Sequence, residues 1–208
     1  MGYVGLLLSG ATLFLNSLML QGKAEGKSVA VFNLFVGALQ VIFPFYMIVT
    51  SDMSNWVLYQ DAAVFLFGLT YLYVGVTFGK GLNGTGLGWF SLWVSIIAIV
   101  YTVVSIVHFH NIVDALTWLM WAYLWFLFYL LNVPEMDIAR YVGKVAMVQS
   151  WVTLTIPALF YLTGVGGTPM VNQMWIAVCS FSLLYFVVSA IQLKVWRKDE
   201  AFTKRKIV

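Results

Sequence analysis

VAVFNLFVGALQVIFPFYMIV, residues 29–49, is a continuous run without a single Asp, Glu, Lys or Arg. A transmembrane α-helix needs about 20 mostly apolar residues to cross the hydrocarbon core of a bilayer, and this run has that length. Pro44 lies inside the run, which a membrane helix tolerates because neighbouring helices can satisfy the freed backbone groups. The stretch therefore predicts a membrane-spanning helix.

Six further stretches of the same kind lie before and after this run. The chain has 208 residues, of which 62% are hydrophobic and only 9% are charged, whereas a soluble domain averages about 25% charged residues. Because a water-facing surface cannot be built from so few charged residues, most of the protein surface must face lipid. We predict an all-α membrane protein with seven transmembrane helices, at about residues 2–20, 29–49, 62–78, 88–107, 112–131, 142–162 and 171–195.

The basic residues are confined to alternate loops. Lys23 and Lys27 follow the first predicted span, Lys80 follows the third, and Arg140 and Lys144 follow the fifth. The remaining Lys and Arg of the 11 in the chain lie from residue 194 onward, at the end of the last span and in the tail. Because Lys and Arg are enriched in cytoplasmic loops, this distribution predicts an N-terminus outside the cell and a C-terminus in the cytoplasm.

Several classes of protein are disfavoured by what the spans lack. No Asp, Glu, Lys or Arg falls in the middle of a predicted span, where such residues usually mark proton relays or ion paths. The Gly-rich turn at residues 79–86 lacks the spacing of a phosphate-binding loop. No His/Cys/Glu cluster has metal-ligand spacing, and no catalytic triad is present. We therefore expect that the protein is not an enzyme and that it binds no cofactor or metal. Because its net charge of +3 comes from residues in the loops and the tail, we also expect no nucleic-acid partner.

Neutral polar side chains remain inside the spans, among them Asn16, Gln149 and Thr153. One interpretation is that they join helices by hydrogen bonds, each worth about 0.6 kcal/mol in a membrane. The other is that together they line a narrow path for a small uncharged solute, since a buried amide in lipid needs a partner or a watery cavity. The sequence leaves both interpretations open.

The fifth span contains WLMWAYLW, residues 118–125. Trp118, Trp121 and Trp125 are spaced i, i+3 and i+7 and therefore share one helix face. Interfacial tryptophans sit at span ends, whereas Trp121 and Trp125 fall near the middle. They either pack in the core and against lipid, or form a constriction whose ring faces pass planar amides and whose indole N–H groups donate hydrogen bonds.

These stretches resemble the AmiS/UreI family of bacterial urea and short-chain amide channels. The resemblance covers about residues 1–163 and rests on FGLTYLY (67–73), WLMWAYLW (118–125) and VQSWVTLTIPA (148–158). It implies a six-helix channel unit with a pore through each protomer, and a hexamer. After this unit we expect an additional seventh helix at residues 164–196 and a basic cytoplasmic tail at residues 197–208. The constriction residues that the resemblance implies are Leu13, Leu69, Tyr73, Trp121, Leu124 and Trp125.

Two positions depart from the family pattern. Gln149 stands where the family usually has Glu, and an amide keeps hydrogen bonding but removes the charge. The acid-gated channels of gastric bacteria have a His-rich loop between the second and third spans, whereas the corresponding loop here, about residues 50–61, has no His. His108 and His110, in the next outer loop, could titrate near pH 6.5 or form a solvated pair. We do not expect acid gating.

The sequence thus predicts a multi-pass protein of the bacterial cytoplasmic membrane, surrounded by lipid. As a hypothesis, it conducts small neutral amides or urea passively and serves a cytoplasmic amidase or urease. Two alternatives stay open: a gradient-coupled amide transporter, and a membrane scaffold or sensor that transports nothing.

Overall fold

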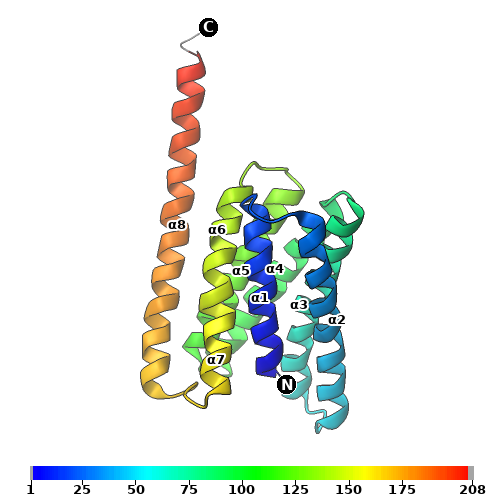
Figure 1. The fold of residues 1–208 in the computed structure, drawn as a ribbon. Coiled ribbons are helices and arrows are strands. Elements are labelled where there is room, and N and C mark those ends of the chain that lie inside the picture. The colour runs from blue at the N-terminus through cyan, green and yellow to red at the C-terminus, as the bar shows by residue number, and fades with distance from the viewer. Residues whose placement is uncertain (1, 206–208) are drawn as a thin grey trace.

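The computed structural model describes residues 2–205, with side chains through residue 193, as a bundle of helices joined by short loops (Figure 1). Their bounds are α1 (Gly2–Leu20), α2 (Gly26–Thr50), α3 (Asn55–Lys80), α4 (Thr85–Val107), α5 (Ile112–Asn132), α6 (Ala139–Gln149), the π-helical turn η1 (Ser150–Thr155), α7 (Ile156–Leu162) and α8 (Pro169–Arg205). Because α6, η1 and α7 run on as one span, seven spans in this part of the chain are long and apolar enough to cross a membrane. The prediction of seven membrane-spanning helices is confirmed.

Local sequence signals set several helix ends. The Glu25 carboxylate caps α2 by accepting hydrogen bonds from the first backbone N–H groups of that helix, and the Asn111 side chain caps α5 in the same way. Gly81 ends α3 with φ +64°, a left-handed conformation that glycine adopts without steric cost. These ends leave loops too short to hold a separate domain.

The bundle is built from two close hairpins and a central helix. α2 packs along α3 and α4 packs along α5, while α1 contacts α2, α6 and η1. Figure 1 shows α1 in the middle of the bundle and α8 at its edge beside α6. α8 packs mainly on α5. The buried apolar core consequently gathers around α5, which contacts α4, α6 and α8.

Two helices extend beyond the predicted spans. α3 begins at Asn55 rather than near residue 62, so Asp61 lies inside the helix and only residues 51–54 form the loop. α8 continues to Arg205 instead of ending near residue 195, and it projects beyond the bundle (Figure 1). A hydropathy pattern marks where the bilayer core ends, and a helix need not stop there. The predicted basic tail is thus helical in backbone to Arg205, while its side chains and residues 206–208 lie outside the described residues.

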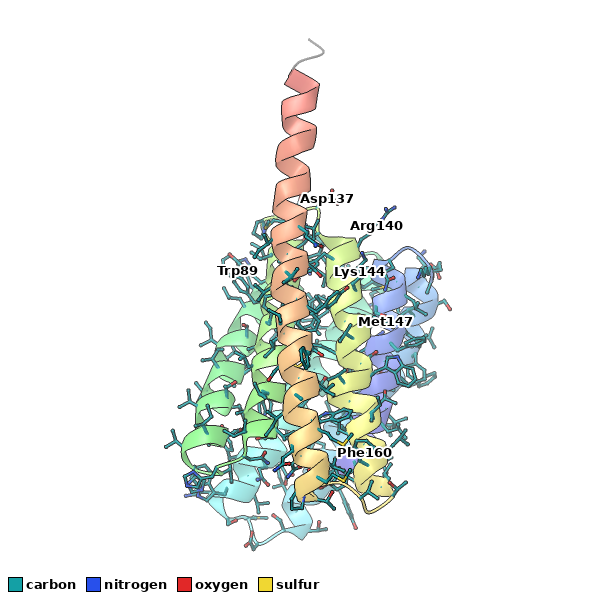
Figure 2. All side chains as sticks on the ribbon, turned by 90° about the vertical axis from the view of Figure 1, so that its left-hand side faces the viewer. Trp89, Asp137, Arg140, Lys144, Met147 and Phe160 are labelled. Atoms are coloured by element: carbon teal, nitrogen blue, oxygen red, sulfur yellow. The ribbon has the colours of Figure 1, made fainter. Side chains whose placement is uncertain are left out.

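The loops with basic residues gather at one end of the bundle. The start of α1 and the end of α8 lie at opposite ends (Figure 1), as an odd number of spans requires. Figure 2 places Arg140 and Lys144, near the start of α6, toward the end of the bundle beyond which α8 projects. The alternation of loops with and without Lys and Arg therefore matches the arrangement of the helices. That the end with the basic residues faces the cytoplasm stays a prediction.

Glycines allow the α2–α3 hairpin to close. A Cβ on Gly37 would lie 2.7 Å from the backbone nitrogen of Leu72, and a Cβ on Gly68 would lie 2.9 Å from the carbonyl carbon of Gln40. Real Cβ atoms do not approach backbone atoms so closely. The two helix backbones therefore touch at these positions, as small residues permit in membrane proteins.

We predict that Gly37→Ala lowers the stability of the protein even though alanine is the better helix former. The added methyl must push α3 away from α2, and such overpacking costs about 1–3 kcal/mol. The measurement is thermal unfolding in detergent, followed by loss of helical circular dichroism. Gly79→Ala is the matched control, because its Cβ would meet its nearest neighbour at an ordinary 3.7 Å. Equal unfolding temperatures for the two variants would contradict the prediction.

Candidate functional site

Three cavities follow one another along the bundle, lined chiefly by α1, α3 and α5. We name them from the predicted orientation. The outer cavity, near the N-terminal end of α1, has a volume of about 460 Å³, and the middle and inner cavities have about 30 Å³ each. Phe67 and Trp121 line both the outer and the middle cavity. Thr70 and Phe128 line both the middle and the inner cavity. The cavities are therefore consecutive, separated by shared side chains.

The order of lining residues along α1 shows that the three cavities lie in one row, which we call the path. Leu6 and Ser9 line the outer cavity, Leu13 lines the middle cavity, and Asn16 and Leu20 line the inner cavity. These positions are three or four residues apart and thus lie on one face of the helix. α3 and α5 contribute stripes in the same order, from Phe67 to Phe78 and from Trp118 to Asn132.

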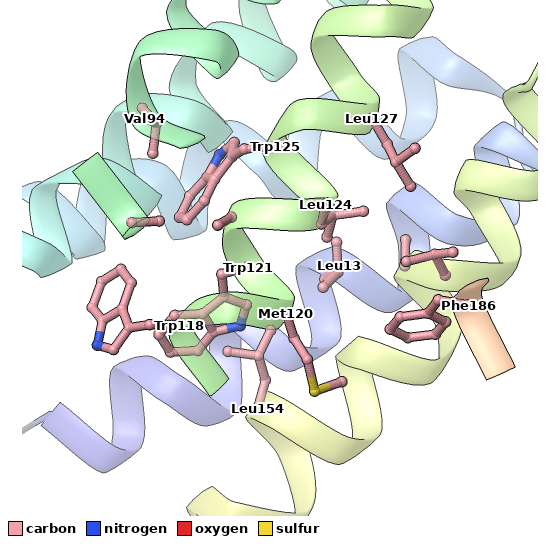
Figure 3. Close-up of a cluster of buried hydrophobic side chains, with 14 of the residues drawn as sticks. Leu13, Val94, Trp118, Met120, Trp121, Leu124, Trp125, Leu127, Leu154 and Phe186 are labelled. Atoms are coloured by element: carbon pink, nitrogen blue, oxygen red, sulfur yellow. The ribbon is translucent and has the colours of Figure 1, made fainter. Parts of the chain in front are cut away.

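The middle of the path is closed by aromatic rings, which we call the aromatic constriction: Phe67 with Trp121 and Trp125. The Phe67 ring lies 4.7 Å from that of Trp121 and 5.0 Å from that of Trp125, centroid to centroid. Leu13 from α1 joins them in the lining of the middle cavity. Figure 3 shows Trp118, Trp121 and Trp125 carried by α5, with Leu13 and Leu124 near them. Four of the six predicted constriction residues come together here, namely Leu13, Trp121, Leu124 and Trp125.

The indole N–H groups of the constriction are already bonded within the protein. Trp121 Nε1 donates to Thr153 Oγ1 at 2.9 Å, and Trp125 Nε1 donates to Thr70 Oγ1 at 3.2 Å. In this structure neither N–H group is therefore free to donate to a passing solute. A buried indole N–H without a partner is costly, so the threonines fix the rings and leave their faces to line the path.

Leu69 and Tyr73 are not brought into the constriction. Their side chains are 46% and 38% exposed, and neither lines any of the three cavities. Along α3 the lining positions are Phe67, Thr70 and Tyr71, spaced i, i+3 and i+4, so Leu69 and Tyr73 project from a different part of the helix surface. The sequence contains this spacing, but it does not say which apolar stripe of a membrane helix faces protein and which faces lipid.

Polar residues of the spans act first as links between helices. Asn16 Nδ2 donates to Asn33 Oδ1 at 3.0 Å, and Asn33 Nδ2 donates back to Asn16 Oδ1 at 2.7 Å, which joins α1 to α2. Gln149 Nε2 donates to the Met120 carbonyl at 2.8 Å and joins α6 to α5. Asn16 also lines the inner cavity, whereas Gln149 is fully buried and lines none of the three. Asn16 thus joins two helices and also lines a cavity, whereas Gln149 joins helices only, and a role for either in the passage of a solute stays a prediction.

The outer cavity offers neutral hydrogen-bonding groups. The Tyr59 hydroxyl lies buried at its wall without a hydrogen-bond partner among the described residues. Gln40 Nε2 donates to the Ser9 hydroxyl at 2.6 Å, and both residues line the cavity. Asp114 is the one carboxylate in the lining, and it accepts a hydrogen bond from the Ser105 hydroxyl. It stands in the first turn of α5, near the mouth, so the deeper path is lined by uncharged side chains.

The two histidines lie at the outer end of α4. The His108 ring stacks on Trp56 at 3.7 Å between centroids, and His110 follows in the loop with φ +50°. Neither lines any of the three cavities, although the intervening Phe109 lines the outer one. Weak pH sensing by this pair stays a prediction. Among the side chains that the structure describes, through residue 193, no three His, Cys, Asp or Glu are grouped so that they could hold a metal ion.

Comparison with known proteins identifies relatives over most of the chain. The family model described as AmiS/UreI family transporter matches residues 1–165. A Rhodococcus erythropolis protein that carries the name transporter protein AmiS2 is 42% identical over 177 residues, covering 84% of this chain and 86% of the relative. The acid-activated urea channel of Helicobacter pylori is 27% identical, covering 74% of this chain and 93% of the relative.

Solved structures agree in fold. The electron cryomicroscopy structure of the Helicobacter pylori urea channel in its closed state superposes with a TM-score of 0.73 at 26% identity, covering 78% of this chain and 98% of that chain. The crystal structure of the urea channel from the same bacterium gives 0.70 at 28% identity, covering 78% of this chain and 97% of that chain. The similarity thus includes nearly the whole of each urea-channel chain.

We predict that Thr153→Val destabilises the protein, because it leaves the Trp121 indole N–H buried without an acceptor. The cost of such a group is about 1–3 kcal/mol. Thr153→Ser keeps the hydroxyl and serves as the control. The measurement is the midpoint of thermal unfolding in detergent, which should fall for the valine variant and stay near wild type for the serine variant. A valine variant as stable as the serine variant would show that the hydrogen bond is unimportant.

Proposed function

The chain belongs to the AmiS/UreI family of transporters, and we propose that it is a passive channel for small neutral amides, namely urea and short-chain aliphatic amides. It is a multi-pass protein of the bacterial inner membrane. Each protomer would carry its own path, because the three cavities lie within one bundle. The single observation that carries the proposal is this series of cavities, interrupted by aromatic rings whose polar atoms are already bonded.

In the proposed mechanism, the outer cavity receives the hydrated solute. The Gln40–Ser9 pair would exchange hydrogen bonds with an amide there. The solute then sheds water and slides along the ring faces of the aromatic constriction, where no free N–H holds it. Asn16 would receive it in the inner cavity. A solute held weakly at each point can both enter and leave, as conduction requires.

Selectivity would follow from the uncharged constriction. Moving an ion out of water into an apolar site costs far more than moving a neutral amide, because nothing there replaces the hydration shell. The side chains around the middle cavity are Leu, Phe, Thr, Tyr and Trp only. Ions are therefore rejected by the cost of desolvation, and planar neutral solutes fit against the rings.

Assembly and cellular role belong to the same proposal. We propose that protomers assemble as hexamers and that the channel supplies a cytoplasmic amidase or urease with substrate. The orientation with the basic loops in the cytoplasm would place the inner cavity on the side of that enzyme. A gradient-coupled amide transporter is the competing function, and the experiment below separates the two.

Reconstituted vesicles test the proposal. We expect acetamide and urea to equilibrate faster than in empty vesicles, at a rate that does not change when a proton or sodium gradient is applied. The rate is measured by light scattering after rapid mixing. Flux equal to that of empty vesicles would refute the channel, and flux that depends on a gradient would instead support the coupled transporter.

The aromatic constriction makes a further prediction. Trp121→Ala should widen the path, so that discrimination between acetamide and the bulkier butyramide falls by about tenfold, the order expected when one apolar contact is lost. Trp93→Ala is the control, because the Trp93 ring is 53% exposed and lines none of the three cavities. Unchanged discrimination in the Trp121 variant would remove this residue from the path.

A further inference from the structure

The span formed by α6, η1 and α7 contains a backbone carbonyl that its own helix cannot satisfy. In η1 the Ile156 N–H bonds to the Trp151 carbonyl, five residues back, as in a π-helix. The next carbonyl, that of Val152, would by the same pattern accept from residue 157. Residue 157 is proline, which has no N–H. A carbonyl left without a donor at membrane depth is costly.

The missing donor comes from the seventh span. Trp175, in the second turn of α8, directs its indole Nε1 to the Val152 carbonyl oxygen at 2.9 Å. Its side chain is only 8% exposed, and its ring lies edge to face against Phe160 at 5.2 Å between centroids. Trp175 lies beyond residue 165, where the family match ends. A residue outside the family-matched segment thus completes a hydrogen bond inside it.

The Val152 carbonyl lies next in sequence to Thr153, the residue that fixes the Trp121 ring of the aromatic constriction. Thr153 follows Val152 in the π-helical turn, and its hydroxyl accepts from Trp121 Nε1 while donating to the Gln149 carbonyl at 2.8 Å. On the other side, α1 lies directly against the turn, since a Cβ on Gly10 would overlap the Thr155 hydroxyl. The turn is therefore held between α1 and α8, with Thr153 facing α5.

We propose that Trp175 is a positioning residue for the path: its hydrogen bond to the Val152 carbonyl holds the π-helical turn in the register at which Thr153 orients the Trp121 ring. The inference rests on the proposed function, because the ring that it positions is part of the proposed constriction. It assigns the seventh helix a role beyond packing, since this helix would set the shape of a path that it does not line.

A second contact keeps α8 in place when this hydrogen bond is removed. Tyr141 donates its hydroxyl hydrogen to the Phe186 carbonyl at 2.8 Å, and the Phe186 side chain is fully buried. Trp175→Phe therefore removes one N–H and keeps an aromatic ring in the same place, without detaching the helix. Phe181→Leu is the matched control on α8, because the Phe181 side chain is 72% exposed.

The test combines flux with backbone exchange. In wild-type vesicles we expect discrimination between acetamide and butyramide, and in Trp175→Phe we expect it to fall by about threefold, the change that one interhelical hydrogen bond in a membrane supports. Hydrogen–deuterium exchange of the peptide spanning residues 149–163 should rise in the same variant. Phe181→Leu should change neither measurement.

The effect of Trp175→Phe is then measured again in a protein that also carries Pro157→Ala. Alanine restores an N–H within the helix that can bond the freed carbonyl, so Trp175→Phe should have a smaller effect there than in the native background. An equal effect in both backgrounds would overturn the proposal, as would a Trp175 variant that behaves like Phe181→Leu. If vesicles with the wild-type protein pass no amide, the proposed function is wrong. Hydrogen–deuterium exchange then still shows whether Trp175 holds the π-helical turn.

Discussion

Polar groups in the membrane-spanning part of this protein are stabilised by partners inside the bundle, because lipid offers none. That constraint explains the pairing of Asn16 with Asn33, the bond from Gln149 to the Met120 carbonyl, and the threonine acceptors of the two constriction tryptophans. The same constraint keeps the spans free of unpaired charge at their centres. What is left along the axis is a series of small cavities with uncharged walls.

The aromatic constriction depends on this hydrogen bonding in a direct way. An indole ring free to turn about its side-chain bonds would block or open the path at random. Trp121 and Trp125 are instead fixed at their nitrogen ends by Thr153 and Thr70, so the ring faces are presented in one orientation. One of these threonines lies in a π-helical turn. Such turns recur at functional sites because they break the regular pattern of backbone bonds.

Much of the architecture could be predicted from the sequence, because membrane helices are read from length, hydropathy and the placement of Lys and Arg. The four constriction residues Leu13, Trp121, Leu124 and Trp125 came from family resemblance, and the structure brings them together. Leu69 and Tyr73 did not join them. In a membrane protein both the core and the lipid face of a helix are apolar, so hydropathy alone cannot assign a stripe to either.

The role of Trp175 could not be predicted from the sequence either. Nothing in the sequence shows that Pro157 follows a π-helical turn, or that the carbonyl it leaves open accepts a hydrogen bond from a tryptophan 23 residues further on. From the sequence, the seventh helix is predicted only as an addition to the six-helix unit. The hydrogen bond from Trp175 to the Val152 carbonyl connects it to the π-helical turn beside the path.

The central claim is that an uncharged, partly dehydrating constriction selects the permeant. Urea and guanidinium test it most directly, since both are small, planar and rich in N–H groups but only guanidinium is charged at neutral pH. Their permeabilities are measured in the same reconstituted vesicles, in wild type and in empty controls. The account predicts that urea passes and that guanidinium stays at the level of empty vesicles. Comparable permeability for the two would contradict it.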